Sequence, residues 1–422
     1  MPLILERDLD RLFRRESARL ISVLTRILGP HNLALAEDVV QDSFATALQE
    51  WAVKGLPDNP PAWLLTTARN RAIDAIRRER RRRTFAPDLA RFLESEWTMS
   101  RTVEEAFDDD WARDDQLRMI FMCCRPEMAT ENRLALILRT LCGLTIPAIA
   151  SALLTTVSTI NKRLYRTRKS LEGVSFELPP KDEFPGVLDT VHTVLYLLFN
   201  EGYLSTGKAP VRREFCQDAI HLTRLLVDEP SVSSSHTLAL ISLMCFAQAR
   251  LDSRVDADGH LVPLDRQDRA SWDRALINAG FAYLARSAQM EAVVAARYHL
   301  EAAIAARHCS AGSFEKTDWE SICNLYDRLL EIDGSGLVRL NRAVAISYRS
   351  GPDVAILLVE ELKEAPDLAS SHLIPATLAN LYQRAGQTDR AGKLVKEALA
   401  RTRTPHERHL IEVQVGRARA DH

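Results

Sequence analysis

Apolar residues recur at helical spacing along most of the chain, whereas runs with strict apolar and polar alternation hardly occur. In residues 61–83, one stripe of a helical wheel contains Leu65, Ala68, Ala72, Ile73 and Ile76. Such a stripe is typical of a helix that packs on a core. Similar spacing continues to the carboxyl end, between breaks at Gly, Pro and Asp. The pattern predicts an all-α protein.

The opposite face of the helix at 61–83 is polar and aromatic. It carries Trp63, Asn70, Asp74, Arg77 and Arg81. An indole beside guanidinium groups suits single-stranded nucleic acid, because bases stack on the ring while phosphates are neutralised. The alternative is a solvated face whose Trp packs under a neighbouring loop.

A second basic segment, residues 144–171, predicts a helix-turn-helix. A short helix opens at Pro147, a break follows at 154–156, and Thr156 caps a longer helix. The predicted buried stripe of the longer helix is Val157, Ile160, Leu164 and Leu171.

The outward side chains of the longer helix suggest contacts with duplex DNA. Residues near the start of a recognition helix reach base edges, and later basic residues reach phosphates. We expect base contacts from Ser158, Thr159, Asn161 and Lys162. We expect phosphate contacts from Arg163, Arg166 and Lys169.

Composition divides the chain into four parts. Residues 1–87 form a helical module that ends in an arginine run, 88–114 an acidic linker, 115–175 the helix-turn-helix module, and 176–422 a long helical extension. The basic and acidic residues nearly cancel, at 55 and 57. The two basic modules therefore stand out against a balanced total.

Composition also limits the classes of function. The longest apolar run, 238–246, is too short to span a bilayer, and the amino end lacks a signal segment, so we expect a cytoplasmic protein without membrane contact. The seven cysteines form no C-x-x-C pair, which predicts buried free thiols. We expect no cofactor and no metal: His308-Cys309 has no second pair at ligand spacing, and 256–259 lacks the further ligands of a calcium loop. The extension contains no nucleophile paired with a base that would predict an enzyme.

The strings AEDVVQDSF at 36–44 and AWLLTTARNRAIDAIRR at 62–78 resemble region 2 of the extracytoplasmic-function sigma factors. The resemblance implies that the β′ clamp helices of RNA polymerase contact Asp38, Gln41, Asp42 and Phe44. It implies that the flipped base and melted strand of the -10 element contact Trp63, Arg69, Asn70, Arg71 and Asp74. We expect Arg77 and Arg81 to bind the DNA backbone.

The string TINKRLYRTRKSL at 159–171 is similar to sigma region 4, which recognises the -35 element. Two departures leave the promoter sequence open: Pro147-Ala148 stands where an acidic residue is frequent, and Ser158 replaces a frequent Gly. The resemblance implies a sigma factor that binds core polymerase through its β′ and β subunits and helps to melt promoters. The alternative is a one-component helix-turn-helix regulator with a helical-repeat sensor.

The extension resembles the long tetratricopeptide-like extension of one group of these sigma factors. Ala343, Ala355 and Val359 recur as Ala379, Ala391 and Val395. The strings FNEGY at 199–203 and QDRASW at 267–272 strengthen the resemblance. We expect the extension to regulate activity in cis, with an unknown regulator as a further partner. The expected regulatory contacts are Asn200, Glu201, Tyr203, Asp265, Gln267, Asp268, Arg269 and Trp272. The last five either make polar contacts at the start of the next helix or form the surface that touches polymerase or the sigma domains.

Overall fold

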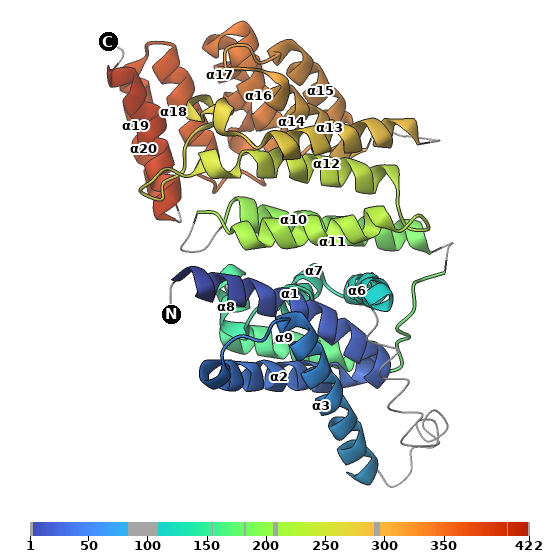
Figure 1. Cartoon of the computed structure of the whole chain (residues 1–422). Helices are drawn as coiled ribbons and strands as arrows, with labels where there is room; N and C mark the ends of the chain where they lie inside the picture. Colours follow the sequence, from blue (N-terminus) through green and yellow to red (C-terminus); the bar gives the residue numbers. More distant parts are fainter. Residues whose placement is uncertain are drawn as a thin grey trace. The chain divides into compact units, whose positions relative to one another are not determined.

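The computed structural model describes residues 3–82, 109–153, 155–180, 183–205, 210–290, 296–402 and 404–420. These residues form α-helices joined by turns and 3-10 helices, and their extended pairing is limited to a bridge between Val255 and Leu261. The all-α prediction is confirmed. None of the described helices has the length and apolar character needed to cross a bilayer. The chain divides into two units, Met1–Leu198 and Phe199–His422 (Figure 1).

The described part of the first unit is built from three long helices and several shorter ones. They are α1 (Leu3–Leu28), η1 (Pro30–Asn32), α2 (Leu33–Lys54), α3 (Pro60–Arg82), α6 (Asp109–Cys123), α7 (Thr130–Thr140), α8 (Ile146–Ala152) and α9 (Val157–Lys169). α10 (Phe184–Tyr203) follows. Because α6 begins at Asp109, the end of the predicted acidic linker is helical, and the rest of that linker lies outside the described residues.

Helices α1, α2 and α3 pack around a shared apolar core (Figure 1). Its fully buried side chains include Leu20, Leu24, Leu33 and Leu64. Gly29 has a φ of 84°, a conformation that side chains with a Cβ rarely adopt, and it turns the chain from α1 toward α2. The core therefore fixes the relative placement of α2 and α3, which carry the predicted polymerase and -10 contacts.

The buried stripe of α3 differs from the predicted one. Leu64, Ala68, Ala72 and Ala75 are buried, whereas Leu65 and Ile73 are half-buried, and the Ile76 side chain lies outside the described residues. The stripe is rotated toward Leu64 because α3 packs on both α1 and α2. A helical wheel of α3 alone does not show that two other helices pack on it.

Helices α6 and α7 pack against α1, so the two helical modules of the first unit touch directly. At Gly143, where φ is 63°, an added Cβ would lie 3.2 Å from the Cα of Arg14. The backbones approach closely at this point, and a glycine satisfies both the space and the dihedral angle.

The second unit is a succession of packed helices (Figure 1). They are α11 (Arg213–Asp228), α12 (Ser235–Ala249), η2 (Leu251–Arg254), η3 (Leu264–Arg266), η4 (Arg269–Ser271), α13 (Arg274–Gln289), α14 (Arg297–Ser310), α15 (Trp319–Ile332), α16 (Gly336–Ser350), α17 (Pro352–Glu360), η5 (Glu361–Glu364), α18 (Leu373–Arg384), α19 (Thr388–Arg401) and α20 (Pro405–Ala420).

The predicted repeat corresponds to two helix pairs, α16 with α17 and α18 with α19. Their small residues, Ala343, Ala355, Ala379 and Ala391, are at most 1% exposed, which lets the paired helices approach closely. The assignment of these pairs to the tetratricopeptide family stays a prediction.

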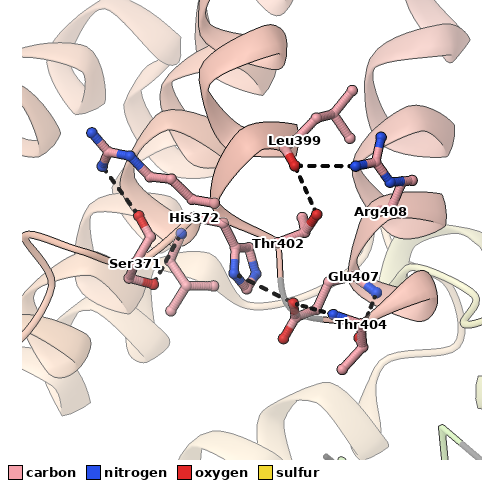
Figure 2. Close-up of polar contacts among 9 residues, drawn as sticks. Ser371, His372, Leu399, Thr402, Thr404, Glu407 and Arg408 are labelled. Carbon is pink, nitrogen blue, oxygen red and sulfur yellow. Dashed lines mark hydrogen bonds and ion pairs between the residues drawn. The ribbon is translucent and has the colours of Figure 1, made fainter. Parts of the chain in front are cut away.

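The last helix, α20, has a firmly capped start (Figure 2). The Thr404 hydroxyl accepts a hydrogen bond from the Glu407 amide at 3.2 Å, and the Glu407 carboxylate accepts one from the Thr404 amide at 3.2 Å. This is a capping box. Glu407 also lies 3.8 Å from Nδ1 of His372, and Arg408 donates to the Leu399 carbonyl at 3.3 Å. These contacts attach α20 to α19 and to the turn before α18.

Candidate functional site

The predicted polymerase-binding face of α2 is largely exposed. Asp38, Gln41 and Asp42 are exposed and lie within little more than one helical turn. Phe44 is half-buried and packs on Phe13, with ring centroids 4.9 Å apart. The three polar side chains are therefore available to a partner, and the aromatic one offers only part of its ring.

Trp63 of α3 is half-buried, so its indole is less exposed than the prediction of an outward ring implies. Its ring meets Trp51 edge-on at a centroid distance of 5.4 Å, and Trp51 stacks on Phe13 at 5.7 Å. Edge-on aromatic contacts of this kind are favourable, which explains why the indole turns toward α2. A base can stack only on the part of the ring that Trp51 leaves uncovered.

The polar row of α3 is present as predicted at two positions. Asn70 and Asp74 are exposed and lie one turn apart on the same face. Arg69 and Arg77 are half-buried, and Arg77 lies 3.8 Å from the Asp74 carboxylate. Arg81 belongs to α3, but its side chain lies outside the described residues. Asn70 and Asp74 are therefore the best presented candidates for base contacts.

Arg71 links α3 to α2. Its guanidinium donates to the Thr46 hydroxyl at 2.5 Å and to the Asp42 carboxylate at 3.4 Å. Both acceptors belong to α2, on the side predicted to bind polymerase. The interaction sets the predicted -10 contacts of α3 in a defined position relative to that face.

The predicted pair of helices with a break between them is present in the second module. The Thr145 hydroxyl accepts from the Ala148 amide at 3.3 Å at the start of α8, and the Thr156 hydroxyl accepts from the Thr159 amide at 3.1 Å at the start of α9. Both residues act as N-caps. Pro147 occupies the first turn of α8, where its missing N–H leaves no hydrogen bond unmade.

The DNA-facing residues predicted on α9 are mostly exposed. The exposed ones are Ser158, Asn161, Lys162, Arg166 and Lys169, and the half-buried ones are Thr159 and Arg163. The Thr159 hydroxyl lies 2.8 Å from that of Thr156, so it is already engaged within the cap. Tyr165, which is 69% exposed, lies among them.

The buried stripe of α9 is correct at three positions and wrong at one. Ile160, Leu164 and Leu171 are buried, but Val157 is 45% exposed. Val157 is the first residue of α9. Thr167 joins the buried face instead, with its hydroxyl donating to the Arg163 carbonyl at 2.8 Å.

A buried acidic residue joins the two modules of the first unit. Glu37 of α2 is 2% exposed, and its Oε2 accepts from Nε of Arg139 at 2.9 Å and from Nη2 of Arg168 at 2.7 Å. These are charge-assisted hydrogen bonds, which are stronger than neutral ones. Partial burial and the negative charge of Glu37 raise the pKa of the neighbouring Asp38.

A second acidic residue makes the reciprocal contact. Asp115 of α6 is fully buried, and its carboxylate accepts from Nε of Arg26 at 2.8 Å and from Nη1 of Arg118 at 3.0 Å. Burial raises the pKa of Asp115 and outweighs the two arginines. Each module thus places one buried carboxylate against an arginine of the other.

Sequence reasoning missed these cross-module contacts. One signal was available for Glu37, because it lies on the apolar stripe of α2 that includes Leu33, Val40 and Ala47. A charged residue on such a stripe requires a buried partner. The sequence does not indicate that Arg139 and Arg168, in distant helices, are the partners.

The end of α10 is a tightly packed junction in the second unit. An added Cβ at Gly202 would lie 2.7 Å from Cys216 and 2.8 Å from the Arg212 carbonyl. The Tyr203 ring lies 3.8 Å from the Arg254 guanidinium. The side chains predicted as regulatory contacts here are all half-buried: Asn200, Glu201 and Tyr203.

The second predicted regulatory cluster lies mostly in the interior of the extension. Gln267, Arg269 and Trp272 are 3–7% exposed, which fits polar contacts inside the extension and corrects the alternative of a surface that touches polymerase or the sigma domains. Asp268 is exposed and caps η4, with its carboxylate accepting from the Ala270 amide at 2.9 Å. Asp265 is half-buried and lines a cavity of 350 Å³.

Arg269 is buried because it closes the end of α14. Its guanidinium donates to the carbonyls of His308 at 2.8 Å and Ala311 at 3.0 Å, and to the Thr317 hydroxyl at 3.0 Å. Burial, together with the charges of Arg250 and Arg269, lowers the pKa of His308 to about 3. His308 is therefore neutral at physiological pH.

All seven cysteines are buried free thiols, as predicted. Burial raises the pKa of the Cys123 and Cys216 thiols to about 12. A thiol reacts as its thiolate, so these side chains are inert packing residues at neutral pH.

Comparisons with known protein families match three separate parts of the chain: the two helical modules of the first unit and the start of the extension. The model of Sigma-70 region 2 matches residues 12–82, that of Sigma-70, region 4 matches residues 118–171, and that of a family of unknown function (DUF6596) matches residues 187–288. The first match covers most of α1 through α3, and the second most of α6 through α9.

Two relatives extend these matches. The uncharacterized protein R00370 of Rhizobium meliloti (strain 1021) is 33% identical over 397 residues, which cover 92% of this chain and 91% of that protein. The ECF RNA polymerase sigma factor SigK of Mycobacterium sp. (strain KMS) is 28% identical over 171 residues, which cover 38% of this chain and 81% of that protein. Sigma-70 regions 2 and 4 imply binding to core RNA polymerase and promoter DNA. The chain belongs to the sigma-70 family, as an alternative sigma factor of the extracytoplasmic-function group with a long helical carboxyl-terminal extension.

Proposed function

We propose that the exposed face of α9 recognises the -35 element. The observation that carries this assignment is the division of α9 into two faces. Ser158, Asn161 and Lys162 are exposed near its start, while Ile160 and Leu164 are buried. Side chains at the start of a recognition helix reach base edges, and the later basic ones bind phosphates. We assign base contacts to Ser158, Thr159, Asn161 and Lys162 and phosphate contacts to Arg163, Arg166 and Lys169.

The -10 element and the melted strand are assigned to α3. Asn70 and Asp74 offer hydrogen-bonding groups to an extruded base, and the uncovered part of Trp63 offers a stacking surface. The remaining members of this surface are Arg69, Arg71, Arg77 and Arg81. Arg71 positions α3 through Asp42 and Thr46, so its contribution to DNA binding is indirect.

Core polymerase is assigned to α2, whose Asp38, Gln41, Asp42 and Phe44 would contact the β′ clamp helices. Residues 1–87 would act as region 2, 115–175 as region 4 with contact to the β subunit, and 176–422 as a regulatory extension that responds to an unknown regulator. The relative that matches this chain over 92% of its length has the same order of regions, extension included.

On this proposal the first unit must open when it engages a promoter. The two promoter elements lie about 25 base pairs apart, which is roughly 85 Å at 3.4 Å per base pair. In the first unit, Arg168 of α9 donates to Glu37 of α2 at 2.7 Å. Arg71 of α3 donates to Asp42, which is five residues from Glu37 on α2, so these contacts hold α3 and α9 far closer together than 85 Å. One rigid arrangement cannot keep them and reach both elements. The extension would control the opening.

In-vitro transcription with core polymerase and promoter fragments tests the assignments. We expect Lys162→Ala to lose roughly 5- to 160-fold of initiation at a duplex promoter, since one specific base contact contributes about 1–3 kcal/mol. The loss should disappear on templates that lack the -35 element. Asn70→Ala should be impaired on duplex DNA and largely restored on a template with a premelted -10 region.

Lys54→Ala is the matched control, because Lys54 is exposed on α2, where it pairs with Glu50 at 2.8 Å, and it belongs to none of the assigned surfaces. Equal losses in all three variants would contradict the assignments. A truncation after Gly173 tests the extension. If the truncated and full chains give the same transcripts under every condition, the extension does not regulate in cis.

A further inference from the structure

The loop between η2 and η3 is held against the last helix of the second unit. A bridge between Val255 and Leu261 closes the loop, and Gly259 turns it with a φ of 84°. Beyond the loop, Arg266 donates to the Val413 carbonyl of α20 at 3.2 Å. Segments from opposite ends of the second unit therefore meet at this point.

Three metal-ligating side chains converge where the loop meets α20. Potential ligand atoms of Asp256, His260 and His409 all lie within 4.8 Å of one another. The two imidazole rings stack, with centroids 3.9 Å apart and planes 19° apart. Asp256 is exposed and the two histidines are half-buried, so ions can enter from solvent.

The carboxylate of Asp256 is already oriented by the loop. Its Oδ1 accepts from the amides of Asp258 at 3.0 Å and His260 at 2.8 Å. These bonds use one oxygen, which leaves Oδ2 to act as a ligand. They also fix the direction of the carboxyl group, as interactions behind a metal ligand commonly do.

We propose that Asp256, His260 and His409 form a binding site for a divalent transition-metal ion of the Zn²⁺ type. Two imidazoles and one carboxylate are donors that suit Zn²⁺ and the other late divalent ions of the first transition-metal row, whereas Ca²⁺ and Mg²⁺ require oxygen ligands. Bonds of about 2.0–2.1 Å place tetrahedral ligand atoms roughly 3.3 Å apart. Side-chain rotations that unstack the rings bring the three donors to that spacing, and the fourth position stays open.

Metal binding at this site joins the loop to α20. The adjoining cavity of 350 Å³ is lined by Asp265 and Arg266 on the loop side and by Gln414 of α20. An ion held by His260 and His409 therefore fixes two walls of that cavity relative to each other. The bound metal would thus connect the loop to α20 and reduce the motion of α20.

Titration of the purified full chain with Co²⁺, followed by displacement with Zn²⁺, tests the site. We expect one ion per chain with visible d–d absorption and without the near-ultraviolet band of thiolate ligation, because the cysteines are buried. His260→Ala and His409→Ala should each weaken binding, measured by calorimetry with Zn²⁺, by roughly 10- to 100-fold. Zn²⁺ should slow amide hydrogen exchange in α20 of the unmodified chain and not in His409→Ala.

Two substitutions serve as controls. His406→Ala changes another histidine of α20, and Asp258→Asn changes an exposed carboxylate of the same loop. Both should bind Zn²⁺ as the unmodified chain does. His409→Gln, which keeps the size of the side chain, guards against loss of folding. Binding that survives in His260→Ala and His409→Ala, or no binding at micromolar Zn²⁺ in the unmodified chain, would overturn the proposal.

Discussion

Glu37→Gln should loosen the contact between the two modules of the first unit. The substitution keeps the shape of the side chain and removes the negative charge that faces Arg139 and Arg168. The Glu37 carboxylate accepts from these arginines at 2.9 and 2.7 Å, in a site where its side chain is 3% exposed. After the change, two guanidinium groups would face a neutral amide.

The size of the effect follows from the burial of the three groups. Removing one partner of a buried ion pair destabilises a structure by about 3–5 kcal/mol. The side chains of Arg139 and Arg168 are 14% and 27% exposed, so water replaces part of the lost interaction. We therefore expect about 2–3 kcal/mol. At about 1.36 kcal/mol for a factor of ten, the open form gains roughly 30- to 160-fold over the closed form.

Distance measurements between spin labels report the opening. Labels at Gln49→Cys in α2 and Ser151→Cys in α8 occupy exposed positions, and the native cysteines are buried and slow to react. Glu37→Gln should shift the distances to longer and broader values. The control is Glu50→Gln, which removes an exposed pair with Lys54 worth at most about 1 kcal/mol.

Equal distance distributions in Glu37→Gln and Glu50→Gln would refute the argument. Circular dichroism separates opening from unfolding, because opening keeps the helices of both modules. If the closed form also limits promoter use, Glu37→Gln should increase transcription by the full chain, whereas a loss of helix would decrease it.

Three further predictions concern the second unit. Gly202→Ala should reduce the free energy of unfolding by about 1–3 kcal/mol, because the added Cβ would lie 2.7 Å from Cys216. The melting temperature of the full chain should therefore fall, and an unchanged value would show that the junction can relax. Thr404→Ala should lower the free energy of local opening at the start of α20 by about 1 kcal/mol, since it removes half of the capping box. Faster amide hydrogen exchange in the first turn of α20 would report this change. Stability around α14 should fall by about 1 kcal/mol between pH 6.5 and pH 5.5, because only the unfolded state protonates His308 there; hydrogen exchange corrected for the intrinsic rate measures it. His308→Asn should remove this part of the dependence and leave the part due to His299, whose pKa burial also lowers.

Local signals in the sequence predicted the elements that carry the candidate surfaces. Thr156 caps α9 as expected, and the small residues Ala355 and Ala391 lie inside helix pairs. These features depend on neighbours within a few residues or on spacing along one helix. Their physical causes, an unsatisfied amide at a helix start and a close approach of two helices, are visible in the local sequence.

Features that depend on distant segments could not be predicted. Trp63 is half-buried because its ring makes an edge-on contact with Trp51 of another helix. Arg269 is buried because the carbonyls at the end of α14 need donors. The sequence shows a tryptophan and an arginine with polar neighbours in both cases, and polarity alone favours an exposed position.

The closed arrangement of the first unit restricts the distance between the two proposed DNA-binding surfaces rather than their accessibility. Lys162 and Arg166 of α9 are exposed while Arg168 of the same helix is bound to Glu37. Asn70 of α3 is exposed in the same arrangement. A closed chain should therefore still bind an isolated -35 duplex and fail to hold both elements of one promoter. A control mechanism acting through this contact would change the span of the protein, so its effect should depend on the spacing of the promoter elements.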